Sequence, residues 1–217
     1  GNLTSIFSNY GNLPLGGFNN ANFRQTFDTD AEFHSVELNY RRRVVGPYCR
    51  FQGSWLFGIR HLVYDNGFSY NGFDGTNTIN GFTFNSDVDN RFLGAQVGFD
   101  LWYNAAPGIS FGSGLKGAWG QNDISQALST SNANDPISVG GRDGTVLIDL
   151  NTTLVYRLSY SLAFRSSHHL IAMDDVAQPT LDQQFLIDYR GAATPAVPVN
   201  EGSLVLQGAT FGIEYLW

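Results

Sequence analysis

The chain has 217 residues, a length that suits one domain large enough to bury a core or to close a β-barrel. Apolar residues make up 42% of it but charged residues only 14%, well below the roughly 25% usual in soluble domains. This composition excludes a disordered protein, the net charge of −7 argues against nucleic acid as a partner, and the single Cys49 excludes an internal disulfide.

The N-terminal segment carries little pattern. The chain starts at Gly1 without Met and without a charged-then-apolar leader, so we expect a mature or truncated product. Residues 1–24 are rich in Gly and Asn and only weakly periodic. We predict one domain over residues 1–217 without a transmembrane helix, because no stretch approaches the roughly 18 consecutive apolar residues that such a helix needs.

The rest of the chain consists of segments whose apolar residues recur with a period of two, as in β-strands. Three hairpins and a final strand are predicted. The hairpins cover residues 31–64 with a turn at "VGPY", 90–122 with a turn at "NAAPG", and 144–172 with a turn at "RLS", and the final strand covers 202–217. Each strand is expected to have about 12–15 residues, roughly twice the usual soluble length. Loops rich in Gly, Asn and Asp are expected over residues 65–89, 122–142 and 174–201.

The two faces of the predicted strands differ consistently. In "NRFLGAQVGFDLWYN", Leu93, Val97 and Phe99 share one face, whereas Gln96 and Asp100 share the other face with glycines. Such a strand suits lipid on one side and a small polar interior on the other, and short turns at one end with long loops at the other are the layout of outer-membrane barrels. We therefore predict an all-β fold, a transmembrane up-and-down antiparallel β-barrel of at least eight strands, of which seven are visible and at least one is N-terminal.

Aromatic residues gather at the end of the predicted short turns. An interfacial girdle is expected there, formed by Trp102, Tyr103, Tyr156 and Tyr160. The last strand has one apolar face, formed by Phe211, Ile213, Tyr215 and Trp217. We predict that this face is the signal read by barrel-insertion machinery and that the chain ends at the periplasmic interface.

Several segments resemble, in order and spacing, the planctomycete outer-membrane β-barrel proteins classed as beta-barrel porin family seven. The segments are "SVELNYRRR", "GSWLFGIRHLVYDNGF", "NRFLGAQVGFDLWY", "GLKGAWGQN", "LVYRLSYSLAFRSSHHLIAMDDVAQP" and "GATFGIEYLW", and the resemblance covers residues 25–217. It implies an outer-membrane barrel of a bacterium with a two-membrane envelope. It also implies further strands before the first of these segments, and it implies no substrate.

The faces opposite to the apolar ones are predicted to line the lumen of the barrel, and they carry charges of both signs. The predicted network consists of Glu37, Arg41, Arg43, Arg60, Asp100, Lys116, Asp149, Arg165 and Glu214. Within the hairpins we expect three pairs: Glu37 opposite Arg60, Asp100 diagonal to Lys116, and Asp149 diagonal to Arg165. The network is then either a selectivity filter or an internal salt-bridge core, and for eight to ten strands we favour the core because side chains nearly fill so narrow a barrel.

Catalysis, cofactors and metals find no support in the sequence. His168 and His169 are adjacent, so on a strand they point to opposite faces and cannot share a metal. Nucleotide-binding motifs are absent, and we predict a protein that is not an enzyme and takes no cofactor. The four Asp residues of segment 65–89 offer oxygen ligands for calcium, but they lack EF-hand spacing and a solvated loop is the favoured interpretation.

Three functions remain open. The foremost is a non-enzymatic outer-membrane β-barrel of porin-like architecture that allows passive diffusion or stabilises the envelope. The alternative is a barrel-anchored surface-assembly or adhesion subunit, and a soluble glycan-binding β-sandwich is favoured only by the density of Trp and Tyr. The expected location is the bacterial outer membrane, and the expected partners are outer-membrane lipid and barrel-insertion machinery, with further copies of the chain or surface-layer components as candidates.

Overall fold

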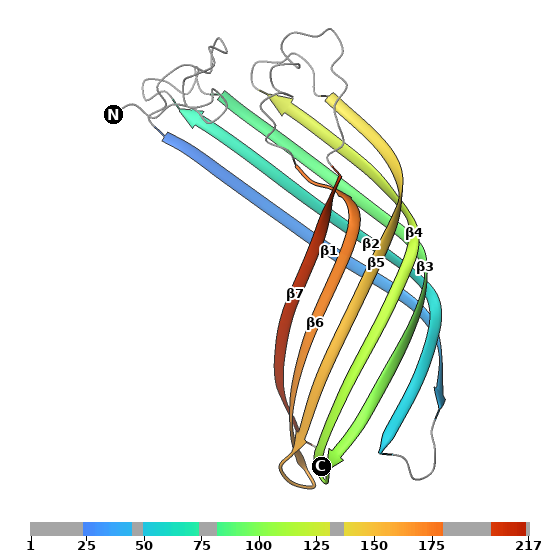
Figure 1. The fold of residues 1–217 in the computed structure, drawn as a ribbon. Helices are drawn as coiled ribbons and strands as arrows, with labels where there is room; N and C mark the ends of the chain where they lie inside the picture. The colour runs from blue at the N-terminus through green and yellow to red at the C-terminus, as the bar shows by residue number, and fades with distance from the viewer. Residues whose placement is uncertain (1–23, 45–49, 74–81, 131–136, 180–200, 216–217) are drawn as a thin grey trace.

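The computed structural model describes residues 24–44, 50–73, 82–130, 137–179 and 201–215. These residues form seven β-strands and no helix (Figure 1). The strands are β1 (Arg24–Val44), β2 (Phe51–Phe73), β3 (Phe82–Ala106), β4 (Ile109–Thr130), β5 (Ile137–Arg157), β6 (Leu162–Ala177) and β7 (Glu201–Tyr215). Among the described residues, no helix has the length and apolar character needed to cross a membrane.

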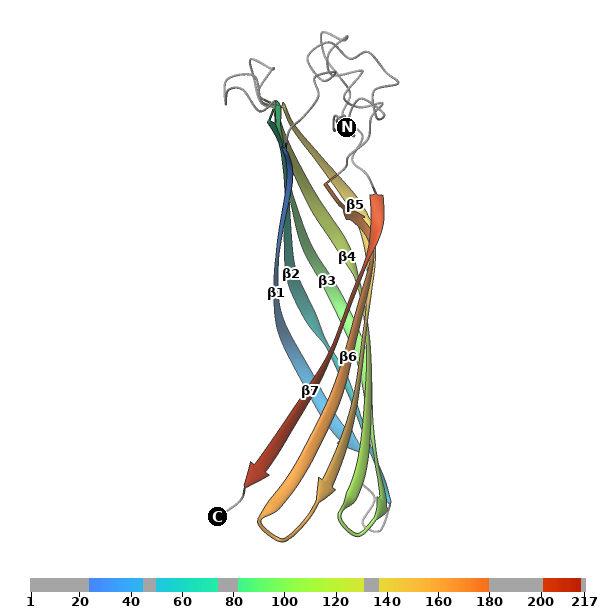
Figure 2. The same cartoon turned by 90° about the vertical axis from the view of Figure 1, so that its left-hand side faces the viewer.

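The seven strands form one antiparallel sheet in which each strand pairs with its neighbour in sequence. The predicted strand order is therefore confirmed. Figures 1 and 2 show that the sheet is a single curled layer, half of a barrel, with β1 and β7 as its edges. The described strands do not pack as two sheets, which removes the basis of the sandwich interpretation. No described strand joins β7 to β1, so closure of the predicted barrel is not found among these residues.

One end of the sheet, here called the turn end, carries the short connections. Residues 107–108 join β3 to β4, and residues 158–161 join β5 to β6. Gly108 has a φ of 86°, a left-handed conformation that glycine adopts without steric penalty. β7 ends at the same place, because Tyr215 pairs with Leu162. Two of the three predicted tight turns are thus confirmed, and the one near residue 46 lies outside the described residues.

The strands are longer than predicted, with 15 residues in the shortest and 25 in the longest. β2 continues to Phe73 and β3 begins at Phe82, so most of the segment predicted as a loop over residues 65–89 is sheet. β4 and β5 likewise extend to Thr130 and from Ile137, into the second predicted loop. The prediction of these loops was wrong because the apolar pattern reverses within each strand.

The reversal is clearest in β3. From position 93 towards the turn end, Leu93, Val97 and Phe99 lie on the convex face, and each is more than half exposed. From position 83 to 91, the same face carries Thr, Asn, Asp, Asp and Arg at alternate residues. The apolar side chains of this second segment lie instead on the concave face, where Phe84 and Phe92 are fully buried.

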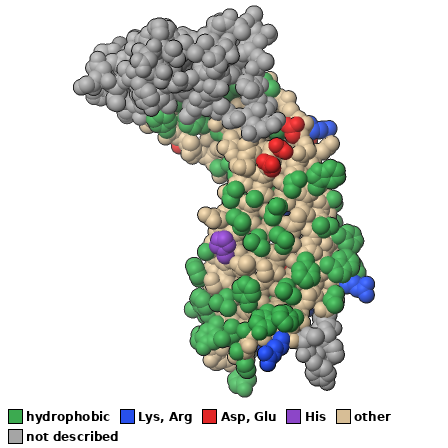
Figure 3. All heavy atoms as spheres, viewed as in Figure 1, with side chains coloured by type: hydrophobic (Ala, Val, Ile, Leu, Met, Phe, Trp, Pro, Cys, Tyr) green, Lys and Arg blue, Asp and Glu red, His purple; other side chains and the backbone are tan. Residues whose placement is uncertain are grey.

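Neighbouring strands reverse at the same level, so the sheet has two zones. The zone near the turn end, here called the belt, exposes large apolar side chains on its convex face (Figure 3). These include Val36, Leu38, Tyr40, Trp55, Phe57, Ile59, Leu115, Trp119, Val146, Ile148, Phe211 and Ile213. The other zone, here called the far zone, has polar residues at most convex positions of β2, β3 and β4.

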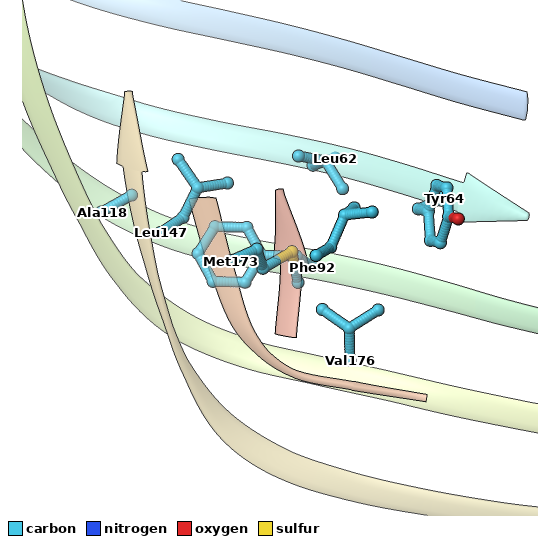
Figure 4. Packing of buried hydrophobic residues seen from close by; sticks show 8 residues of the cluster. Leu62, Tyr64, Phe92, Ala118, Leu147, Met173 and Val176 are labelled. Atoms are coloured by element: carbon cyan, nitrogen blue, oxygen red, sulfur yellow. The ribbon is translucent and has the colours of Figure 1, made fainter. Parts of the chain in front are cut away.

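The core lies on the concave face, where strands that are not neighbours come together. An apolar cluster is formed there by Leu62, Tyr64, Phe92, Ala118, Leu147, Met173, Val176 and Leu204. Figure 4 shows that these side chains come from strands β2 to β6 and point into one space, with β7 contributing the last of them.

The end of β6 completes this core by bending across the concave face. Its register with β7 shifts between Met173 and Val176, and the strand turns towards β3 and β4 (Figure 4). The side chain of Asn90 accepts a hydrogen bond from the backbone N–H of Ala177 at 2.9 Å and donates one to the carbonyl of Ala177 at 3.0 Å. Asn122 donates a further bond, at 3.1 Å, to the carbonyl of Asp175. Two asparagines therefore pair with the end of β6 as a neighbouring strand would.

Candidate functional site

The curvature of the sheet gathers four of the predicted charges into one cluster on the concave face. Glu37, Arg60, Lys116 and Asp149 come from β1, β2, β4 and β5, and this set is here called the charge cluster. Strand alternation turns each of them inward. β2 and β5 are separated by two strands, so their side chains meet only because the sheet curls.

Arg60 is the centre of the charge cluster. Its side chain is 2% exposed, and its Nη1 atom lies 2.8 Å from Asp149 Oδ2 and 3.3 Å from Glu37 Oε1. Its Nε donates a hydrogen bond to Ser35 Oγ at 3.0 Å. Lys116 Nζ lies 2.9 Å from Glu37 Oε2 and 3.7 Å from Asp149 Oδ2. Two cations thus balance two carboxylates, which is the condition for burying them at a tolerable desolvation penalty.

The three predicted pairs have different outcomes. Glu37 lies directly opposite Arg60, as predicted. Lys116 lies opposite Gly98, which is diagonal to Asp100 as predicted, but the carboxylate of Asp100 pairs with Arg41 at 3.1 Å.

The pairing of Asp149 with Arg165 is wrong. Asp149 lies opposite Ile171, whereas Arg165 lies opposite Val155 and pairs with Glu214 at 2.9 Å. The reason is the register of this hairpin, which starts with Arg157 opposite Ala163 after the connection over residues 158–161. The turn is therefore centred on residue 160, whereas the predicted turn covered residues 157–159, and this shift moves every pairing partner along β6.

Between the charge cluster and the turn end, the concave face is hollowed into three adjoining depressions of about 1200, 420 and 370 Å³. Together they are here called the vestibule, and Trp102 lines all three. The indole of Trp102 lies flat over Gly112, because a Cβ on Gly112 would meet three of its ring atoms at 2.8–2.9 Å. Glycine is required here so that the ring can lie against the backbone. Arg43 also lines the vestibule, next to Arg41.

The predicted girdle therefore needs a correction. Trp102 faces the concave side with Asp100, and it cannot join its neighbour Tyr103 in an outward girdle. Tyr103 stacks on Phe51 with 4.6 Å between ring centroids. Tyr156 is exposed, and Tyr160 is fully exposed in the connection at the turn end. Phe211, Ile213 and Tyr215 are exposed on the convex face of β7, and Trp217 lies outside the described residues.

The apolar cluster was missed by the sequence reasoning, which expected a small and polar concave face throughout. Leu62, Phe92 and Leu147 fall on inward positions of their strands, so the signal was present in the alternation. Burial in this region also raises the pKa of Tyr64. The apolar cluster lies directly beyond the charge cluster, as seen from the turn end, and excludes water from that level of the concave face.

A row of carboxylates crosses the convex face of the far zone. Glu32, Asp65 and Asp89 lie opposite one another on β1, β2 and β3. The pKa of Asp65 is raised, first by burial and then by the negative charge of Asp89, while Arg91 opposes the shift. Asp65 Oδ1 is buried without a hydrogen-bond partner among the described residues. The favoured interpretation of a solvated loop was thus wrong for Asp65, Asp87 and Asp89, which lie on strands, and Asp74 lies outside the described residues.

The chemical capacity of the site is set by these neighbours. His169 lies on the concave face beside Asn151, and its neighbour His168 points to the opposite face. Within the described ranges, no group of three His, Cys, Asp or Glu residues is placed to hold a metal ion. No protein family, curated protein or solved structure matches this chain.

Proposed function

We propose that this chain forms the wall of an outer-membrane β-barrel of porin-like architecture, whose interior is closed by side chains and which stabilises the envelope. One observation carries the proposal: large apolar side chains are exposed on the convex face of the belt in six of the seven strands, β1 to β5 and β7. In water such a surface would aggregate, whereas in lipid it is the expected outer surface.

The dimensions of the belt support the same proposal. In β3 it runs from Leu93 to Leu101, about 26 Å along a strand. At a tilt of about 40° this corresponds to a height of about 20 Å, close to the apolar band of about 25 Å in outer-membrane barrels. The change to polar residues beyond Arg91 then marks the interface with water.

The ion pairs across the concave face favour a narrow barrel. Two strands lie between the strand of Arg60 and that of Asp149, and two strands also lie between the strand of Glu37 and that of Lys116. Contacts of this kind are made only at a radius at which side chains fill the interior. The charge cluster and the apolar cluster together are expected to block the passage of hydrated ions.

The direction of the edge strands limits how the barrel is completed. β1 and β7 both run towards the turn end, since five antiparallel strands lie between them. Their open edges would leave backbone N–H and C=O groups unpaired in lipid, which costs several kcal/mol per group. An antiparallel closure therefore requires an odd number of further strands, and a total of at least eight.

Conductance across a planar bilayer tests the proposal, with a heat-modifiability gel to show that the protein is folded. We expect low conductance for the wild type. Arg60→Ala removes the central cation and leaves space for water, so we expect a higher conductance. Arg165→Ala, which removes an exposed arginine nearer the turn end, is the matched control. High conductance of the wild type, unchanged in Arg60→Ala, would favour an open pore for passive diffusion instead.

The far zone favours a second candidate, a surface-assembly subunit anchored by the barrel. β3 extends from Phe82 to Arg91 beyond the belt, about 30 Å along the strand, and β2, β4 and β5 extend with it. Such a wall would present a rigid surface outside the membrane. Sedimentation of the detergent-folded protein with and without outward substitutions such as Asp87→Arg tests for association between copies, and a monodisperse monomer under all conditions would count against self-assembly.

A further inference from the structure

The vestibule carries an excess of positive charge, although the whole chain has a net charge of −7. Its lining has six cationic side chains, those of Arg41, Arg43, Arg50, Lys116, Arg157 and Arg165. It has four carboxylates, those of Glu37, Asp100, Asp149 and Glu214. Each of these carboxylates has a cationic partner within ion-pair distance. The excess therefore resides in cations that have no carboxylate partner.

Three arginines nearest the turn end carry this excess. Arg43 lies on the concave face of β1, Arg50 precedes β2, and Arg157 ends β5. All three are exposed, and their guanidinium groups form no ion pair or hydrogen bond with any residue that the structure describes. At the entrance of the vestibule they thus offer bidentate donors that no described carboxylate occupies, and guanidinium is the group that binds carboxylate and phosphate best.

Deeper in the vestibule, Trp102 offers a different contact. One face of its indole covers Gly112, and the ring lines all three depressions that make up the vestibule. Aromatic rings at such positions bind the apolar face of a flat or ring-shaped ligand. Ser54, Asn151 and Thr153 provide hydrogen-bonding groups on the same walls. The largest depression, about 1200 Å³, has room for a small organic molecule.

The geometry points to a binding site for a small organic anion, one that joins a phosphate or carboxylate group to a ring. The anionic group binds at the arginines of the entrance, and the ring lies against Trp102. The charge cluster lies at the inner end of the site, where Glu37, Lys116 and Asp149 line one of the depressions. This inference does not depend on whether the barrel conducts.

Isothermal titration of the detergent-folded chain with glucose 6-phosphate tests the site, with glucose as the neutral control. We expect binding of glucose 6-phosphate that weakens with added salt, and no binding of glucose. Arg43→Gln and Arg157→Gln should each weaken binding by about tenfold. Trp102→Ala should weaken binding of glucose 6-phosphate but leave binding of inorganic phosphate unchanged. These arginines are exposed and form no ion pair with a described residue, so the variants are expected to fold, and heat modifiability checks this.

Arg42→Gln is the matched control. Arg42 is adjacent to Arg43 in the sequence and carries the same charge, but its side chain lies on the convex face, away from the vestibule. Equal affinities for Arg42→Gln and Arg43→Gln, or equal binding of glucose and glucose 6-phosphate, would overturn the proposal. A second series uses detergent micelles containing phosphatidylglycerol. If binding that depends on Arg43 is found only with this lipid, the site takes a lipid headgroup and the proposed solute site is refuted.

Discussion

Replacing Arg60 by Met tests whether the charge cluster is a buried and neutral unit. Methionine keeps much of the side-chain volume and removes the charge, which separates electrostatics from packing. The change removes contacts of 2.8 Å to Asp149 and 3.3 Å to Glu37. Of the two cations in the cluster, Lys116 then remains, at 2.9 and 3.7 Å from the two carboxylates.

The expected loss follows from this arrangement. Removing one partner of a buried ion pair costs about 3–5 kcal/mol, because the other charge stays buried without compensation. Lys116 still neutralises one carboxylate, so we expect the lower end of that range, about 3 kcal/mol of unfolding free energy. In the double variant Arg60→Met with Asp149→Asn the cluster is neutral again, and most of this loss should be recovered.

The assay is a urea titration of the protein folded into lipid vesicles, followed by tryptophan fluorescence and by heat modifiability. Arg165→Met is the control, because the pair of Arg165 with Glu214 is about half exposed and such pairs contribute at most about 1 kcal/mol. A loss in Arg60→Met no larger than that in Arg165→Met would refute the reasoning. A double variant less stable than Arg60→Met alone would refute it as well.

Three further changes test other parts of the structure. Val97→Arg, in the belt, should lower the unfolding free energy by about 2–4 kcal/mol in the same titration, whereas Asp87→Arg on the same face of β3 should have little effect; equal losses would contradict the boundary between the zones. Asp65→Asn should raise stability at neutral pH, because the raised pKa of Asp65 means that its charged form is disfavoured in the folded protein. Since protonation removes the same charge in the wild type, this gain should shrink as the pH falls through that raised pKa, and a gain that does not change with pH would contradict the reasoning. Asn90→Ala should speed hydrogen exchange at the amide of Ala177 and lower stability by about 1–3 kcal/mol, whereas Asn85→Ala, which removes hydrogen bonds to Ser69 and Ser129 instead, should leave exchange at that amide unchanged.

The strand order, and the faces of the strands within the belt, were predictable because alternation in segments such as 93–101 is unbroken. A hairpin with a short turn also sets a local register, which is why Glu37 could be placed opposite Arg60. The contact of Arg60 with Asp149 could not be found in this way. It depends on the curvature of the whole sheet, and the alternation of apolar and polar residues within single strands does not predict that curvature.

The far zone was missed for a different reason. The prediction required apolar residues on one face along the whole strand, and in segment 82–92 that face is polar while the apolar residues have moved to the other. Rich Asn, Asp and Gly content then favoured a loop. The bend of β6 was also beyond the sequence, because the asparagines that hold it, Asn90 and Asn122, lie on other strands.

The convex face is apolar in the belt and polar in the far zone. A strand that is misaligned with its neighbours would therefore place unsuitable side chains both in lipid and in water. If β3 slipped by one residue against β2, every side chain would turn to the other face. In the proposed barrel, Asp100 would then enter lipid while Phe84 entered water. A slip by two residues keeps the faces but moves Arg91 into lipid or Leu93 out of it. Lipid and water together therefore disfavour a strand that turns the wrong face outward and a strand that is inserted at the wrong depth.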